Sequence, residues 1–276
     1  QNLCDIVCRE LDLKYDKCDL SDWTNMLERV KNRDKTVKIA LVGKYTKLHD
    51  AYLSVVEALS HAGYENSAII DIKWVDAETV NKDTVDYLLK DCQGILVPGG
   101  FGDRGIEGMV CASNYARVND IPYLGVCLGM QIAVIEYARN VLNMENANST
   151  EFDLETKYPV IALMPDQFGN IMGGTMRLGA YPCKVKEKTM LHKCYGDLNI
   201  SERHRHRYEF NNDFREQMIE NGLTIAGTSP DGKLVEAVEV EKNKFHVGVQ
   251  YHPEFKSRPN RANPIFKGFI NAAVSM

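Results

Sequence analysis

Three features that the sequence lacks narrow its possible functions. No apolar run approaches the roughly 20 residues that a membrane-spanning helix needs. The start, Gln1-Asn2-Leu3-Cys4-Asp5, lacks the basic-then-apolar pattern of a secretory signal. Positive charge is not in excess either, because 33 Lys and Arg stand against 38 Asp and Glu, a formal net charge of −5. This balance argues against a broad nucleic-acid surface, so we expect neither a membrane nor a nucleic acid among the partners.

Cysteine pairs with metal-ligand spacing are also absent. The eight cysteines are scattered and none forms a Cys-x-x-Cys pair, so the sequence predicts no structural zinc site. An even cysteine count in a large acidic chain without a signal peptide is weak evidence for disulfides. We therefore predict reduced cysteines and a cytoplasmic location, with seven of the eight packed as small hydrophobic side chains.

What is present is the pattern of an α/β domain. With 276 residues, of which 44% are hydrophobic, the chain can bury a full core. Short β-branched or apolar runs alternate with amphipathic segments as far as position 139, which predicts a mostly parallel central sheet flanked by helices. The second half contains more extended segments. The expected strands cover 37–43, 68–74, 94–98, 122–126, 180–185, 223–228, 234–240 and 245–250, and the expected helices 50–62, 85–90, 109–118 and 130–139.

Residues 1–35 differ from the rest of the chain. Apolar side chains recur at helical spacing from Leu20 to Val30, and the polar run 31–35 has the composition of a solvated connection. The segment therefore reads as a surface helix followed by a linker. The chain opens on Gln1 rather than Met, as a fragment of a longer protein would.

One apparent motif can be set aside. Gly43-Lys44 follows the first expected strand, as the lysine of a phosphate-binding P-loop would. However, position 38 is not Gly, and Tyr45 replaces the hydroxyl residue that would contact magnesium. We predict no nucleotide-phosphate site at Lys44.

The segment Gly125-Val126-Cys127-Leu128-Gly129 is the cysteine form of a nucleophile elbow. A nucleophile on a tight strand-to-helix turn has a strained backbone, and the glycines remove side chains that would collide there. The following helix directs free backbone N–H groups at the sulfur, which favours the thiolate. The pattern alone also fits a buried cysteine in a turn, but the strand and helix expected around it favour a nucleophile.

A second segment can supply a base and a carboxylate. On an extended segment, residues two apart face the same way, so His252 and Glu254 can lie close together. Glu254 could then hold the imidazole tautomer while His252 activates the thiol, and Pro253 would stiffen the geometry. A lone His-Pro-Glu is more often just a turn. Combined with the elbow, it predicts a triad of Cys127, His252 and Glu254.

Together, Gly-x-Cys-x-Gly at 125–129 and His-Pro-Glu at 252–254 resemble the class I glutamine amidotransferases. Four longer segments are similar to the CTP synthase family within that class: 97–102, 146–152, 173–179 and 202–209. The resemblance implies an α/β fold with a Cys-His-Glu triad, to which we add a smaller antiparallel sheet for the strand-rich second half. It covers the chain from about residue 36. We accordingly assign 36–276 to an amidotransferase domain and 1–35 to the linker and tail of a missing synthetase domain.

The resemblance implies a reaction. Cys127 would attack the side-chain amide of L-glutamine and form a glutamyl thioester, which water would release as glutamate. His252 would protonate the departing ammonia and later activate the water. The backbone N–H groups of Gly100 and Leu128 would hold the oxyanion.

The resemblance also implies how glutamine is recognised. Glu151 matches a position that binds the substrate ammonium, and Arg207 one that meets its carboxylate. Gly99 and Gln131 stand at further glutamine-binding positions, together with Gly100 and Leu128. The residues themselves leave other readings open, because Glu151 could be a plain surface acid. The arginines at 203, 205 and 207 could also be a solvated strand face, with His204, His206 and Tyr208 on the other face; a metal site at the two histidines lacks a third ligand.

The family's partners and cofactors follow from the same resemblance. Its synthetase domain uses ATP and Mg²⁺ to aminate UTP with the delivered ammonia, so we expect no cofactor and no metal in this chain. GTP is expected as an allosteric activator, and the full-length enzyme as a homotetramer. The segment Phe101–Gly105 stands where a mobile lid beside the active site would lie.

Three other functions remain to be weighed. An esterase of the α/β-hydrolase type would place its acid between nucleophile and histidine in chain order, whereas Glu254 follows His252. An isolated regulatory or scaffold domain could keep the triad without turnover. A γ-glutamyl hydrolase would share the triad but acts on secreted or lysosomal substrates, and the missing signal argues against it.

Overall fold

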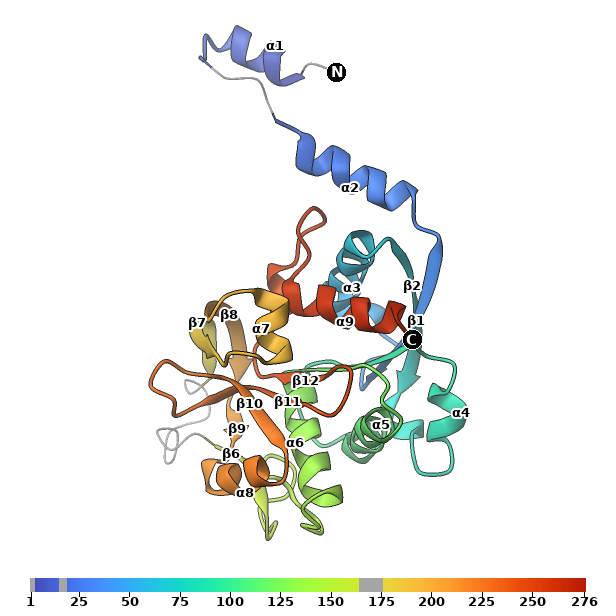
Figure 1. Ribbon diagram of the computed structural model, residues 1–276, viewed down its shortest axis with the longest axis vertical. Helices are drawn as coiled ribbons and strands as arrows, with labels where there is room; N and C mark the ends of the chain where they lie inside the picture. The colour runs from blue at the N-terminus through green and yellow to red at the C-terminus, as the bar shows by residue number, and fades with distance from the viewer. Residues whose placement is uncertain (1–2, 15–18, 164–175) are drawn as a thin grey trace.

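The structure is a computed structural model that describes residues 3–14, 19–163 and 176–276. Within them, a nine-stranded sheet has the order β2-β1-β3-β4-β12-β11-β10-β7-β8 (Figure 1). The first five strands run parallel: β2 (Ala68–Asp76), β1 (Lys35–Gly43), β3 (Gly94–Val97), β4 (Tyr123–Val126) and β12 (His246–Val249). The other four join antiparallel: β11 (Val235–Val240), β10 (Leu223–Thr228), β7 (Arg177–Val185) and β8 (Asn199–His206).

A small second sheet lies beside the main one. It consists of β5 (Asn148–Ser149), β6 (Pro159–Leu163) and β9 (Tyr208–Phe210), with one parallel and one antiparallel pair. The predicted α/β class is confirmed. The antiparallel strands predicted from the second half lie in the main sheet, however, because β12 pairs parallel with β4 on one side and antiparallel with β11 on the other.

Each face of the main sheet has its own hydrophobic core, because successive side chains of a strand point to opposite faces. Along β1, Ile39 and Leu41 belong to one core and Ala40 and Val42 to the other. The first core includes α3 (Leu53–Glu65), α7 (Met190–Tyr195) and α9 (Pro264–Val274). The second includes α4 (Val85–Leu89), α5 (Ile106–Val118), α6 (Leu128–Asn140) and α8 (Arg215–Glu220). Short 3-10 turns are η1 (His49–Tyr52), η2 (Ala77–Thr79), η4 (Asn212–Phe214) and η5 (Pro253–Lys256).

Helix α6 is the most deeply buried helix described. Every residue from Leu128 to Ala138 is buried, so the helix is covered on all sides and lacks a polar face. The strands and helices predicted from the sequence are present with ends shifted by a few residues. Helix α9 was missed, although Asn263 caps it and Pro264 begins it, which is a recognisable start signal.

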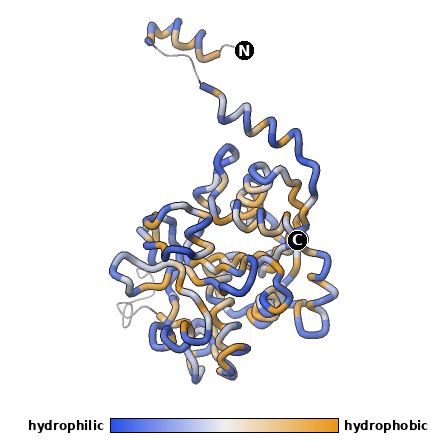
Figure 2. Tube along the Cα trace, in the orientation of Figure 1, coloured by the Kyte–Doolittle hydropathy of each residue, from blue (hydrophilic) through white to orange (hydrophobic). Residues whose placement is uncertain are grey.

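The N-terminal helices lie apart from these cores (Figure 1). Helix α1 (Leu3–Glu10) buries no residue and α2 (Ser21–Lys31) buries only Met26. Hydrophobic and hydrophilic residues alternate along α1 in Figure 2, and its apolar side chains, such as Leu3 and Ile6, are exposed to solvent. The main sheet begins beyond these helices, with β1 at Lys35.

Two expectations from composition can be compared with the fold. Among the described segments, none of the helices combines the length and hydrophobicity that crossing a bilayer requires. The described cysteines all carry free thiols. The prediction that seven cysteines pack as hydrophobic side chains is wrong for Cys4, because α1 lies away from the core and leaves that thiol exposed.

His246 makes the stability of the fold depend on pH. It is buried in β12, and its ring stacks on Tyr123 with 4.5 Å between ring centroids. Burial, followed by the charge of Arg117, lowers the pKa of His246 to about 3. The unfolded chain, with an ordinary histidine pKa near 6.5, takes up a proton that the folded protein excludes. The free energy of unfolding therefore decreases as the pH falls from about 6.5 towards 3, because protonation of His246 then favours the unfolded chain.

We expect His246→Gln to flatten the decline of stability in acid. Between pH 6 and 4 the slope of the unfolding free energy should decrease by up to about 1.4 kcal/mol per pH unit, since one proton fewer is taken up on unfolding. Urea unfolding at a series of pH values measures this slope in the parent and the variant. The lowered pKa values of His204 and His206 affect both proteins equally, and the raised pKa of Glu236 opposes them in both. An unchanged slope would contradict the assignment.

Candidate active site

Cys127 occupies the strained turn that the sequence predicts. Strand β4 ends at Val126 and α6 begins at Leu128, which leaves Cys127 between them with φ 53° and ψ −100°. A positive φ is unfavourable for a residue with a Cβ atom, so the surrounding structure must hold it in place. The Cys127 N–H donates to the Val249 carbonyl at 2.7 Å, which fixes the turn to β12.

The two glycines of the elbow are required by close backbone contacts. A Cβ atom on Gly125 would lie 2.4 Å from the carbonyl oxygen of Gly129. One on Gly129 would lie 2.1 Å from the carbonyl oxygen of Val97 in β3. Both distances are far below van der Waals contact, and backbone atoms cannot rotate away as a side chain can.

His252 and Glu254 meet as expected, but through a different local structure. The Nδ1 atom of His252 lies 2.7 Å from Oε1 of Glu254, and both side chains are buried. The prediction of an extended segment is wrong here. Strand β12 ends at Val249, and Pro253 begins the 3-10 turn η5, a position that its fixed φ and missing N–H suit.

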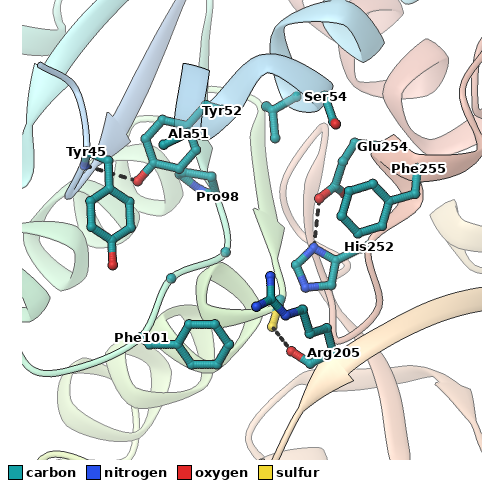
Figure 3. A pocket seen from close by; sticks show the side chains of 14 residues that line it. Tyr45, Ala51, Tyr52, Ser54, Pro98, Phe101, Arg205, His252, Glu254 and Phe255 are labelled. Carbon is teal, nitrogen blue, oxygen red and sulfur yellow. Dashed lines mark hydrogen bonds and ion pairs between the residues drawn. The ribbon is translucent and has the colours of Figure 1, made fainter. Parts of the chain in front are cut away.

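The imidazole and the sulfur come together beside Gly99. A Cβ atom on Gly99 would lie 2.8 Å from Cε1 of His252 and 3.6 Å from Cβ of Cys127. Burial lowers the pKa of His252, but the adjacent Cys127 sulfur and the Glu254 carboxylate outweigh burial and raise it above its ordinary value. Because Nδ1 faces Glu254, as Figure 3 shows, Nε2 is left for the sulfur. The structure thus unites the three residues of the predicted triad.

A small cavity on one side of Cys127 contains most of the predicted glutamine-binding residues. They are Gly100, Leu128, Gln131, Glu151 and Arg207. Its wall also includes residues that the sequence analysis did not assign to substrate binding: Phe101, His206 and Tyr208. His206 could have been found from the alternating pattern of β8, in which Glu202, His204 and His206 are buried and Arg203 and Arg205 are exposed.

Glu151 and Gln131 already have partners in this cavity. Glu151 Oε1 accepts a hydrogen bond from the N–H of Gly102 at 3.0 Å. Gln131 Nε2 donates to the Tyr208 carbonyl at 3.0 Å and to Gln250 Oε1 at 3.3 Å. Glu151 is therefore hydrogen-bonded to the segment 101–105, and Gln131 to Tyr208 and Gln250.

Cys127 also lines a second cavity (Figure 3). Its wall includes Tyr45, Tyr52, Arg205 and Phe255, together with Gly99 and the triad. Gly100 and Phe101 line both cavities, so the start of the predicted lid lies between them.

Lys44 holds this lid segment in place. Its Nζ atom donates to the carbonyls of Phe101 and Gly102. Burial lowers the pKa of Lys44 to about 8, although the charges of Glu151 and Asp103 oppose the shift.

His204 and His206, the two histidines considered above as possible metal ligands, are hydrogen-bonded to each other. His204 Nδ1 and His206 Nε2 lie 2.9 Å apart, and burial, followed by the charge of Arg177, lowers the pKa of both. In the part of the chain that the structure describes, no three metal-ligating side chains converge. Residues 173–175 of the similar segment 173–179 lie outside the described residues.

Comparison with known proteins identifies the family. The family model described as glutamine amidotransferase class-I matches residues 47–272. The chain is similar to the glutaminase domain of Trypanosoma brucei CTPS with bound acivicin, at 40% identity and a TM-score of 0.82, over 87% of this chain and 94% of that one. The chain belongs to the class-I glutamine amidotransferases, in their CTP synthase branch.

Curated relatives of this amidotransferase support the same branch. It is 55% identical to the CTP synthase of Clostridium kluyveri over all of this chain and 51% of that protein. It is 57% identical to the CTP synthase of Clostridium beijerinckii over 99% of this chain and 51% of that protein. The chain thus spans about half the length of these relatives. Membership in this family of glutamine-hydrolysing enzymes argues against both the esterase and the γ-glutamyl hydrolase.

We expect Gly129→Ala to destabilise this amidotransferase domain strongly, because the added Cβ would collide with the Val97 carbonyl. The loss should be roughly 3 kcal/mol or more, as for other severe overpacking in a core. Gly100→Ala is a matched control, since its Cβ would meet only side-chain atoms, with the nearest, at the end of Leu128, 3.3 Å away and those of Lys44 at 3.6 Å or more. Thermal and urea unfolding measure both variants. Equal stability of the two would contradict the steric argument.

Proposed function

We propose that this domain hydrolyses L-glutamine to glutamate and ammonia through a glutamyl thioester on Cys127. The observation that carries the proposal is the convergence of Cys127, His252 and Glu254 beside a cavity that also contains Glu151 and Arg207. A nucleophile, a base and a bracing carboxylate are the parts that acyl transfer needs.

The proposed reaction begins with transfer of the thiol proton to His252. The thiolate attacks the amide carbon of glutamine, and the N–H groups of Gly100 and Leu128 receive the charge that develops on the oxygen. Leu128 is suited to this because the first N–H groups of a helix have no partner within it. His252 then gives its proton to the leaving ammonia and takes one from water, which releases glutamate.

Recognition of the amino-acid end uses opposite charges. Glu151 would bind the α-ammonium of glutamine, and Arg207 its α-carboxylate, with Gln131 and Gly99 completing the pocket. The two charged residues line the same cavity as Cys127. A substrate analogue that lacks either charge would lose the charge-assisted contact with Glu151 or with Arg207, which gives strong discrimination.

For the whole protein we propose the CTP synthase reaction. Residues 1–35 would connect domain 36–276 to a synthetase domain that uses ATP and Mg²⁺ to aminate UTP with the released ammonia. The half-length match to CTP synthases and the absence of buried side chains in α1 support this. Free ammonia is protonated and lost in water, so a closed passage between the domains is the physical requirement. We propose a cytoplasmic homotetramer; the free thiols of the described cysteines support that compartment.

We expect Cys127→Ala to lower glutamine hydrolysis by at least roughly 1,000-fold, because the thioester cannot form. Glutamate release measures this, with Cys111→Ala as a control at a half-buried cysteine away from the site. In the full-length enzyme, synthesis from added ammonia should persist in Cys127→Ala. Normal hydrolysis in that variant would overturn the mechanism.

Labelling with an electrophilic glutamine analogue distinguishes the proposed enzyme from the remaining alternative, a regulatory or scaffold domain that keeps the triad without turnover. An adduct mapped to the Cys127 peptide, together with glutamate release, supports the enzyme. An adduct without any turnover would support a regulatory domain with a surviving triad. An adduct on a different cysteine would show that the site assignment is wrong.

The lid proposal concerns GTP activation. The segment Phe101–Gly105 begins at a residue that lines both cavities, and it is held by Lys44 and by Arg104, which pairs with Glu78. We expect Arg104→Ala to change glutaminase rates in the full-length enzyme and to reduce their stimulation by GTP. Arg261→Ala, at an exposed arginine outside both cavities, is the matched control. If Arg104→Ala matched the parent both with and without GTP, the lid would have no role in activation.

A further inference from the structure

Gln250 reaches the nucleophile from the strand beside it. It follows β12, and its backbone N–H donates to the Glu236 carbonyl of β11 at 2.8 Å. Its side chain is fully buried, and Nε2 lies 3.7 Å from Sγ of Cys127. This position follows from the register, because β12 pairs with β4 and the Cys127 N–H bonds Val249, the residue before Gln250.

The amide of Gln250 is oriented by a chain of hydrogen bonds. Gln131 Nε2 donates to the Tyr208 carbonyl, which can only accept, so the atom of Gln131 at this point is its NH₂ group. That group also donates to the side chain of Gln250, at 3.3 Å, and the receiving atom must therefore be Oε1. The NH₂ group of Gln250 is left to face the sulfur.

The other groups around the sulfur have different roles. The Arg205 carbonyl of β8 lies 4.0 Å from Sγ and can accept from the thiol but cannot stabilise a thiolate. His252 lies beside the sulfur, with Glu254 behind it. Besides His252 and Glu254, the titratable and charged groups that share cavities with Cys127 are His206, Arg207, Glu151 and Tyr208 in the smaller cavity and Tyr45, Tyr52 and Arg205 in the other.

We propose that Gln250 is a further catalytic residue, whose amide N–H donates a hydrogen bond to the Cys127 sulfur and stabilises the thiolate formed when the thiol proton passes to His252. The inference rests on the proposed function of Cys127 as the nucleophile. A neutral amide suits this role because it donates to the negative sulfur without supplying a proton that would quench it. Complete burial strengthens the bond, because no water competes for the sulfur from that side.

The test compares Gln250→Met, which keeps the volume and removes the N–H, with the parent 276-residue chain. Alkylation of Cys127 by iodoacetamide is followed against pH, and the modified peptide is mapped. We expect the midpoint of the profile to rise by about one pH unit and kcat for glutamine hydrolysis to fall roughly tenfold, the effect of losing a hydrogen bond to a charged group. KM should stay within about twofold, because Gln250 contacts the sulfur and does not line the glutamine cavity.

Control variants keep the result decisive. Gln217→Met, at an exposed glutamine of α8, should leave the profile, kcat and KM unchanged. Gln250→Glu keeps the oxygen that accepts from Gln131 but places a carboxylate beside the sulfur, so its midpoint should rise by more than one unit. Gln250→Leu, which also lacks the N–H and adds no charge, gives the answer should Gln250→Met fail to fold. An unshifted midpoint in the folded Met or Leu variant overturns the proposal, even if KM or thermal stability changes.

The alkylation profile is independent of turnover. If Cys127 were not the nucleophile, Cys127→Ala would keep hydrolysing glutamine whatever the Gln250 variants showed. A shifted midpoint in Gln250→Met with unchanged kcat would show that the hydrogen bond exists but does not serve the reaction, and this would also overturn the catalytic role.

Discussion

The hydrogen bond from the Cys127 N–H to the Val249 carbonyl is the interaction on which the site depends. It joins the strained turn after β4 to the end of β12, and β12 leads directly into Gln250, His252 and Glu254. A cysteine with φ near +53° needs such outside support, because its own backbone preference disfavours the conformation. The hydrogen bond that stabilises the strained conformation of Cys127 therefore also fixes how far its sulfur lies from the residues that follow β12.

Packing around α6 makes that turn rigid. The helix is buried on all sides, and its first turn lies so close to β3 and β4 that only glycine fits at 125 and 129. Protein interiors resist small displacements because they are packed as densely as organic crystals. Cys127 consequently sits at the start of a helix that is buried from Leu128 to Ala138, whereas the segment 101–105 is held by a few polar contacts from Lys44 and Glu151.

Burial has opposite consequences for histidines in neighbouring positions. His204, His206 and His246 are buried with lowered pKa values, so they remain neutral and serve as polar packing. His252 is also buried, yet the sulfur on one side and Glu254 on the other raise its pKa. Residue type and burial alone do not distinguish His252 from the other three histidines; the adjacent negative groups do.

The sequence by itself determined the elements and the three residues of the proposed triad, because both depend on local signals. Alternating strands and helices, the glycines around Cys127 and the His-Pro-Glu segment all act over a few residues, and their prediction needed no contacts between distant parts of the chain. Tertiary structure alone decided that the antiparallel strands would join the main sheet and that His252 and Glu254 would meet through a 3-10 turn. It also placed Gln250 against the sulfur, because strand register and burial bring together residues 123 positions apart, and no local pattern encodes that contact.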